Sequence, residues 1–110
     1  MAQQFRGSYT VTITPFTEDG KAIDLAAWRR FVDWQLAEGV PGIIILGTTG
    51  EFLTVTDEER STFVEATVKH VAGRIPVMVG TMNAYTPNAV RYSREAQDLA
   101  VAIRQQRDTL

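Results

Sequence analysis

Residues 40 to 51 read Val40-Pro-Gly-Ile-Ile-Ile-Leu-Gly-Thr-Thr-Gly-Glu51, and the rest of the chain can be understood as a scaffold for this segment. From Ile43 to Leu46 it has four bulky apolar residues in succession, which is typical of a short strand covered on both faces in a parallel sheet. Gly47 and Gly50 bracket two threonines, so we expect a tight turn there. In α/β folds this end of a strand is where ligands bind.

The turn after this strand has two interpretations. Thr48 and Thr49 offer two hydroxyls beside a row of backbone N–H groups, which together suit a small anion such as a carboxylate or phosphate. Alternatively, the threonines bond only to their own backbone in a structural turn. No Gly-Lys-Ser/Thr follows the turn and no Gly-x-Gly-x-x-Gly occurs in the chain, so neither a P-loop nor a dinucleotide fingerprint is present.

Composition excludes several classes of function. Of its 110 residues 45% are hydrophobic and 22% are charged, as in ordinary globular domains. A closed eight-stranded α/β barrel typically has roughly 250 residues, so 110 residues are too few for one. Its 11 basic and 13 acidic residues are dispersed, which argues against nucleic acid and against a polybasic membrane patch. Cysteine is absent, so disulfides and thiolate chemistry are excluded. No apolar run is long enough for a membrane span, and we take the cytoplasm as the default location.

The rest of the chain predicts three strand–helix units. Local signals are β-branched runs for strands, Asp24 and the Thr56–Glu59 capping box for helix starts, and glycines for helix ends. In chain order we expect a strand at 8–14, a helix between Asp24 and Gly39, a strand at 43–46, a helix between Thr56 and Gly73, a strand at 75–79 and a helix from Thr86-Pro87 onward.

Right-handed crossovers would set these strands side by side and parallel. The carboxyl ends of the strands, at Thr14, Leu46 and Val79, would then share one face with the loops that follow them. We expect the chemistry of the protein on that face. The predicted fold class is therefore α/β, with parallel strands and the helices outside.

The order and spacing of several short blocks resemble the N-terminal third of the dihydrodipicolinate synthase and N-acetylneuraminate lyase family, over about residues 7 to 100. The blocks are Thr14-Pro-Phe, Asp19-Gly20 with Asp24, Gly39-Val40, Gly47-Thr-Thr-Gly-Glu51, Leu53-Thr54 with Glu59, Gly73-Arg74-Ile-Pro-Val and Gly80-Thr81. The resemblance implies that the chain is the first three βα units of a (β/α)8 TIM barrel. It also implies an aldolase or lyase that acts on pyruvate-type substrates through a Schiff base on a lysine, without metal or organic cofactor.

The resemblance assigns roles to the central motif. The family holds the carboxylate of bound pyruvate at the segment that matches Gly47 to Glu51. Thr48 would supply a hydroxyl and, in the synthase branch, pass a proton along a relay with tyrosines. Thr49 would supply its hydroxyl and its backbone N–H. These residues identify the keto acid but leave the second substrate, an aldehyde or sugar, open.

The catalytic lysine is expected to be absent from this chain. The family's Schiff-base lysine and its relay tyrosine correspond to positions beyond residue 110, and Lys21 and Lys69 read as surface lysines. We therefore expect residues 1–110, a partial TIM-barrel domain, to be inactive alone. Residues 101–110 diverge from the fourth strand that the family would begin, which suggests a truncated chain or an interrupted or frame-shifted gene, with a natural three-unit domain as the alternative.

A noncatalytic function is the competing hypothesis. Three parallel strands would leave an unpaired edge and apolar faces exposed, so the chain could be an α/β module that binds a carboxylate or associates with itself as a homo-oligomer. Five further residues are expected to have structural roles. We expect Glu51 to brace its loop, His70 to lie at the surface, Tyr85 to pack in its loop, and one of the two tryptophans, Trp28 and Trp34, to be in the core with the other partly exposed or at a subunit contact.

Overall fold

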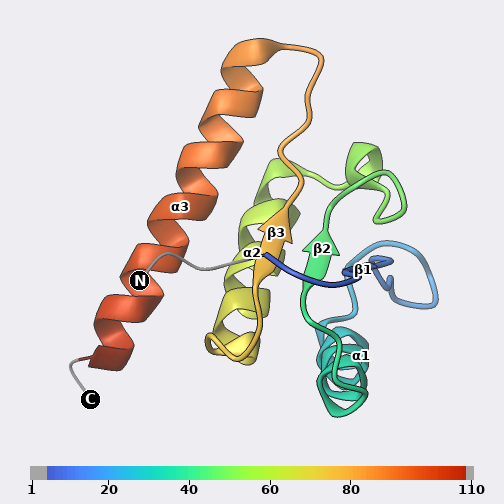
Figure 1. The fold of residues 1–110 in the computed structure, drawn as a ribbon. Coiled ribbons are helices and arrows are strands. Elements are labelled where there is room, and N and C mark those ends of the chain that lie inside the picture. The colour runs from blue at the N-terminus through green and yellow to red at the C-terminus, as the bar shows by residue number, and fades with distance from the viewer. Residues whose placement is uncertain (1–4, 109–110) are drawn as a thin grey trace.

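The computed structural model describes residues 5–108 and has three βα units in succession (Figure 1). The elements are β1 (Thr10–Val11), α1 (Leu25–Ala37), β2 (Ile43–Ile45), the 3₁₀ turn η1 (Phe52–Thr54), α2 (Asp57–Val71), β3 (Val77–Val79) and α3 (Thr86–Asp108). The helices begin and end close to the predicted positions, and the strands are shorter than predicted.

The strands form one parallel sheet in the order β1-β2-β3, which confirms the predicted α/β class. One row across the sheet consists of Val11, Ile44 and Met78, which are register partners. Val11 is 48% exposed and Met78 is 45% exposed, so residues 5–108 cover the outer parts of this row only by about half. The opposite side of β2 carries Ile43 and Ile45, both fully buried.

The helix starts follow from their caps. The Asp24 carboxylate accepts a hydrogen bond from the N–H of Ala27 at 2.9 Å and opens α1. The capping box of α2 is complete: Thr56 Oγ1 accepts from the N–H of Glu59 at 3.1 Å, and the Glu59 carboxylate accepts from the N–H of Thr56 at 3.0 Å. Gly39, with a φ of 78°, follows the end of α1 as predicted.

The core lies between β2 and the helices α1 and α2. Its fully or almost fully buried apolar residues are Trp28, Val32, Ile43, Ile45, Leu46, Phe63, Val64 and Val71. Trp28 stacks on Phe31 with ring centroids 5.6 Å apart and meets Phe63 at 4.8 Å. Trp34 is 56% exposed, so one tryptophan is in the core and the other at the surface, as predicted.

Among residues 5–108, no helix combines the length and the apolar character that crossing a membrane requires.

Candidate functional site

The loop from Gly47 to Gly50 directly follows β2 and exposes both threonines. Gly47 and Gly50 are buried, whereas the side chains of Thr48 and Thr49 face solvent. The loop is closed by its own backbone, since the N–H of Glu51 donates to the carbonyl of Thr48 at 3.0 Å. Within the described part of the chain, neither threonine hydroxyl has a hydrogen-bond partner. Both hydroxyls are therefore free to bind a ligand, rather than bonding to the local backbone.

The backbone of this loop turns at positions that the sequence did not indicate. Leu46 and Glu51 have φ values of 57° and 56°, in the left-handed region that bulky residues rarely adopt. The predicted tight turn is present, but Gly47 and Gly50 are not among the residues with positive φ, so the left-handed positions fall on Leu46 and Glu51 instead. Gly50 is needed for close approach instead, because a Cβ there would lie 3.1 Å from the Leu46 nitrogen and 3.2 Å from the Thr12 carbonyl oxygen.

Two neighbouring strands support the loop. On the β1 side, the buried Thr14 hydroxyl donates to the carbonyl of Gly50 at 2.7 Å. On the β3 side, the N–H of Gly80 donates to the carbonyl of Ile45 at 2.8 Å. Gly80 also lies directly against the Leu46–Gly47 peptide, since a Cβ at Gly80 would be 2.2 Å from the Leu46 carbonyl oxygen. The loop is thus held from both sides by residues at the carboxyl ends of the adjacent strands.

Arg60 on α2 is a buried charged residue that sequence reasoning missed. It is only 5% exposed, and its Nη1 donates to the carbonyl of Gly80 at 2.7 Å. Its guanidinium carbon lies 4.2 Å from the centroid of the Tyr92 ring on α3, a cation–π contact. Burial lowers the pKa of the Arg60 guanidinium. The available signal was its spacing, since Arg60 continues the apolar stripe of Phe63, Val64 and Thr67 by one turn.

A polar cluster joins α2 to α3 beside Arg60. The Asp57 carboxylate accepts from the Tyr92 hydroxyl at 2.6 Å and from Nη2 of Arg91 at 3.0 Å. The hydrogen bond from Tyr92, and then that from Arg91, lower the pKa of the Asp57 carboxyl below its ordinary value. Ser61 of α2 also contacts the Glu95 carboxylate of α3. These contacts fix the helix that carries Arg60.

The remaining candidates of the sequence lie in ordinary surface settings. Lys21 is exposed, and Lys69 pairs with Glu65 at 2.8 Å on the outer side of α2. His70 pairs with Asp33 at 2.6 Å, which ties α2 to α1. Tyr85 is 63% exposed, so the expectation that it packs in its loop was wrong.

Glu51 braces its loop through the backbone only. Its carbonyl accepts from the Thr54 hydroxyl at 2.8 Å, and its side chain makes no capping hydrogen bond. Within residues 5–108 no group of three or more His, Cys, Asp or Glu residues could hold a metal ion.

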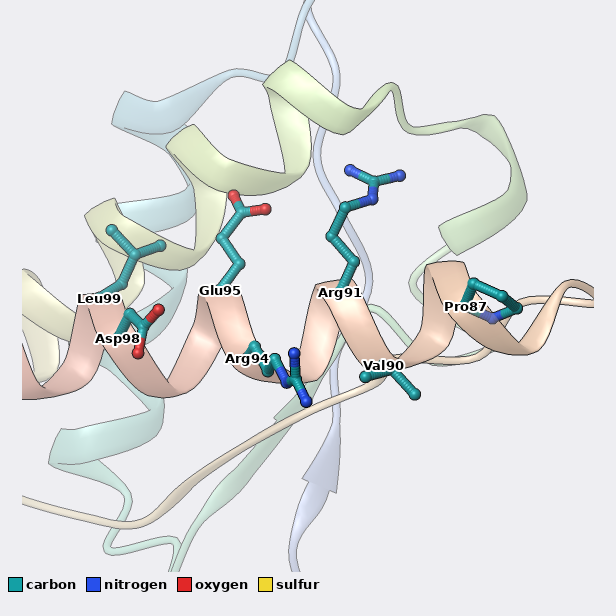
Figure 2. A pocket seen from close by; sticks show the side chains of 7 residues that line it. All are labelled: Pro87, Val90, Arg91, Arg94, Glu95, Asp98 and Leu99. Atoms are coloured by element: carbon teal, nitrogen blue, oxygen red, sulfur yellow. The ribbon is translucent and has the colours of Figure 1, made fainter.

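The described cavities are lined by residues outside the threonine loop. The largest described, with a volume of about 590 Å³, runs along α3, and Figure 2 shows Arg91 and Glu95 extending from that helix toward α2. It is lined by Pro87, Val90, Arg91, Arg94, Glu95, Asp98 and Leu99. A second, of about 260 Å³, lies between the start of α1 and the start of α2. Neither includes Thr48 or Thr49.

Comparison with known proteins gives consistent matches. The model of the dihydrodipicolinate synthetase family matches residues 4–103. Among curated proteins, 4-hydroxy-tetrahydrodipicolinate synthase of Gluconacetobacter diazotrophicus is 47% identical over 95 residues, which are 86% of this chain and 32% of that protein. The same enzyme of Kosmotoga olearia is 44% identical over 95 residues, again 86% of this chain and 32% of that protein.

Solved structures agree with these matches. Dihydrodipicolinate synthase from Aquifex aeolicus superposes with a TM-score of 0.81 at 38% identity, over 86% of this chain and 32% of its own. A prophage protein of the dihydrodipicolinic acid synthase family from E. coli K12, in complex with pyruvate, superposes with a TM-score of 0.83 at 31% identity, over 89% of this chain and 33% of its own. The chain therefore spans about a third of the length of the relatives it matches.

Proposed function

We propose, from the premise that this chain belongs to the dihydrodipicolinate synthetase family, that it binds the carboxylate of a pyruvate-like keto acid at Gly47, Thr48 and Thr49. In this proposal residues 1–110 form a partial TIM-barrel domain of a cytoplasmic Schiff-base aldolase, with residues 7–100 family-like and 101–110 divergent. The observation that carries the proposal is the pair of exposed, unpartnered hydroxyls on a loop with a fixed backbone.

The donors in this loop suit the chemistry of a keto acid. Hydroxyl and N–H donors are neutral, so they hold a carboxylate without adding a base that would compete for protons. Fixing the carboxylate orients the neighbouring keto carbon toward an attacking amine, which is the positioning that Schiff-base formation needs. Thr48 would also pass a proton along a relay. No metal or organic cofactor is required for these steps.

We also propose that the amine of the reaction is absent from this chain. Lys69 is paired with Glu65 on α2, and Lys21 lies in the exposed turn before α1, so neither is part of the threonine loop. Binding without chemistry is then the expected behaviour of residues 1–110. Borohydride reduction in the presence of pyruvate should leave the mass of the chain unchanged, and a trapped covalent adduct would contradict this expectation.

The test of the binding proposal is a pyruvate titration of matched variants, followed by NMR. Removing one hydroxyl, in Thr48→Val or Thr49→Val, should weaken pyruvate binding about five- to tenfold, the usual effect of losing one hydrogen bond. Thr62→Val is the control, since Thr62 is also exposed but lies on α2. Acetone, which has the keto group without the carboxylate, should not bind. If pyruvate binds equally well to all three variants, the assignment of the loop is wrong.

A noncatalytic, self-associating module is the second candidate. It is favoured by the partly exposed side chains of Val11 and Met78 on one face of the sheet, because an exposed apolar surface can associate with a second copy of the chain. Sedimentation of the wild-type chain at several concentrations separates the candidates when read with the titration. Association without any pyruvate binding supports the module, and saturable pyruvate binding supports the keto-acid site.

A further inference from the structure

We propose that Arg60 is a positioning residue for the Gly47–Gly50 loop, acting through the carbonyl of Gly80. The proposal rests on the function proposed above, in which this loop binds a carboxylate. It assigns to a residue of α2, outside the loop, the task of holding the loop's hydroxyls and N–H groups in place. Arg60 would touch neither substrate nor reacting atoms.

The first step is that the guanidinium of Arg60 is itself fixed. It has little room to move, since the residue is 5% exposed and its charged end lies against the Tyr92 ring. The ring is held in turn by the bond from the Tyr92 hydroxyl to Asp57, which begins the same helix as Arg60. An arginine stacked on an aromatic face keeps its planar donors in one orientation. Arg60 therefore offers Gly80 a rigid donor.

The second step is that Gly80 passes this constraint to the loop. Its carbonyl accepts from Arg60, and its N–H donates to Ile45, the last residue of β2. Its Cα lies so close to the next peptide that an added Cβ would be 2.8 Å from the Leu46 carbonyl carbon and 3.2 Å from the Gly47 nitrogen. A displacement of Gly80 would thus have to move the peptide from which the loop starts.

The third step is that the loop needs such support. Leu46 and Glu51, at its two ends, both have left-handed backbone conformations, which are costly for residues with a side chain. Thr14 holds the second end through the Gly50 carbonyl. Gly80, fixed by Arg60, holds the first end. Without the Arg60 bond, the strained Leu46 turn would lose one of these two supports.

The test is hydrogen exchange, followed by mass spectrometry at single-residue resolution, in wild-type chain and in Arg60→Met. Two reporter amides are hydrogen-bonded at the loop: Gly80 to Ile45, and Glu51 to Thr48. The reference amide is Ile43, bonded to Pro76 at the other end of the same strand pair. We expect Arg60→Met to speed exchange at Gly80 and Glu51 about tenfold or more, as loss of a charged hydrogen bond implies, and to leave Ile43 almost unchanged.

Two further variants make this result specific. Arg60→Lys keeps a cationic donor and should restore at least half of the lost protection, on a logarithmic scale. Arg91→Met removes an arginine from the same cluster that does not contact Gly80, and should leave the exchange of Gly80 as in wild type. Equal acceleration at Ile43 and Gly80, or no acceleration at Gly80, would overturn the proposal, because a residue that only stabilises the fold affects both amides alike.

If Arg60→Met does not fold, two changes at Tyr92 decide the question. Tyr92→Leu removes the face on which Arg60 stacks and should speed exchange at Gly80, whereas Tyr92→Phe keeps the ring, loses only its bond to Asp57 and should speed that exchange clearly less. Equal effects of the two changes would contradict the proposal. A separate pyruvate titration keeps the two proposals distinct: absence of binding to the wild-type chain refutes the carboxylate site, while the exchange result still decides the role of Arg60.

Discussion

A methyl group at Gly80 tests how β3 supports the threonine loop. In Gly80→Ala the new Cβ would lie 2.2 Å from the Leu46 carbonyl oxygen, where ordinary van der Waals contact begins at 3.4 Å. The Leu46 peptide would therefore have to move by roughly 1 Å, and a close-packed interior leaves little space for such a movement. It cannot do so easily, because Leu46 is fully buried and already left-handed. We expect a loss of about 3 kcal/mol of unfolding free energy, the upper part of the range for overpacking.

The assay for Gly80→Ala is urea unfolding followed by tryptophan fluorescence, which reports on the buried Trp28. Gly47→Ala is the matched control: a Cβ at Gly47 meets nothing within 4 Å and its φ is not positive, so we expect a change of less than about 1 kcal/mol. Midpoints must agree at two protein concentrations, so that association does not contribute. If Gly80→Ala is as stable as Gly47→Ala, the close contact between β3 and the loop does not exist.

Two further predictions concern the helices. Thr67→Val should lower the unfolding free energy in urea by about 1–3 kcal/mol, because it removes the hydroxyl that accepts a hydrogen bond from the buried Nε1–H of Trp28 at 2.9 Å. Thr67→Ser keeps the hydroxyl and should cost less. The reverse order would refute this account. The lowered pKa of Asp57 implies stabilisation that is present above the ordinary aspartate pKa of about 3.9 and is lost as pH falls through the lowered value. An NMR titration should show the Asp57 pKa rising in Tyr92→Phe, whereas an unchanged value would mean that the Tyr92 hydroxyl is not its main cause.

Local sequence signals predicted the order of elements and the helix ends. The caps at Asp24 and Thr56 require only residues three positions away, so they can be read directly from the sequence. Three consecutive strand–helix units then follow with parallel pairing, because crossover connections leave few alternatives. What the sequence predicts well is therefore what neighbouring residues determine.

The supports of the candidate site could not be predicted in the same way. Thr14 and Gly50 are 36 residues apart, and Arg60 and Gly80 are 20 apart, so no short pattern connects the partners. The left-handed turn also falls on Leu46, which reads as the last residue of a buried strand. Gly50 serves close approach rather than a special φ, and a sequence shows only that glycine is present.

Polar and apolar side chains alternate along residues 11–14, and it is the polar ones that are buried. Thr12 and Thr14 are 1% and 3% exposed, whereas Val11 and Ile13 are 48% and 54% exposed. The threonines are buried because their hydroxyls have specific acceptors, the carbonyls of Ile44 and Gly50. Thr12 thus bonds to β2 and Thr14 to the loop, while Val11 and Ile13 lie on the exposed side of the segment. Thr14 therefore occupies a buried position with a polar side chain that supports the candidate site.

Support for the loop is therefore separate from the Schiff-base chemistry proposed above. Thr14, Gly80 and Arg60 all lie within the three units described here, and together they hold both ends of the loop. None of them supplies a nucleophile. A site built in this way can bind a carboxylate in its final geometry before any amine approaches, which lowers the entropic cost of the later step. On this reasoning pyruvate binding and Schiff-base formation are separable, and this chain should retain the first without the second.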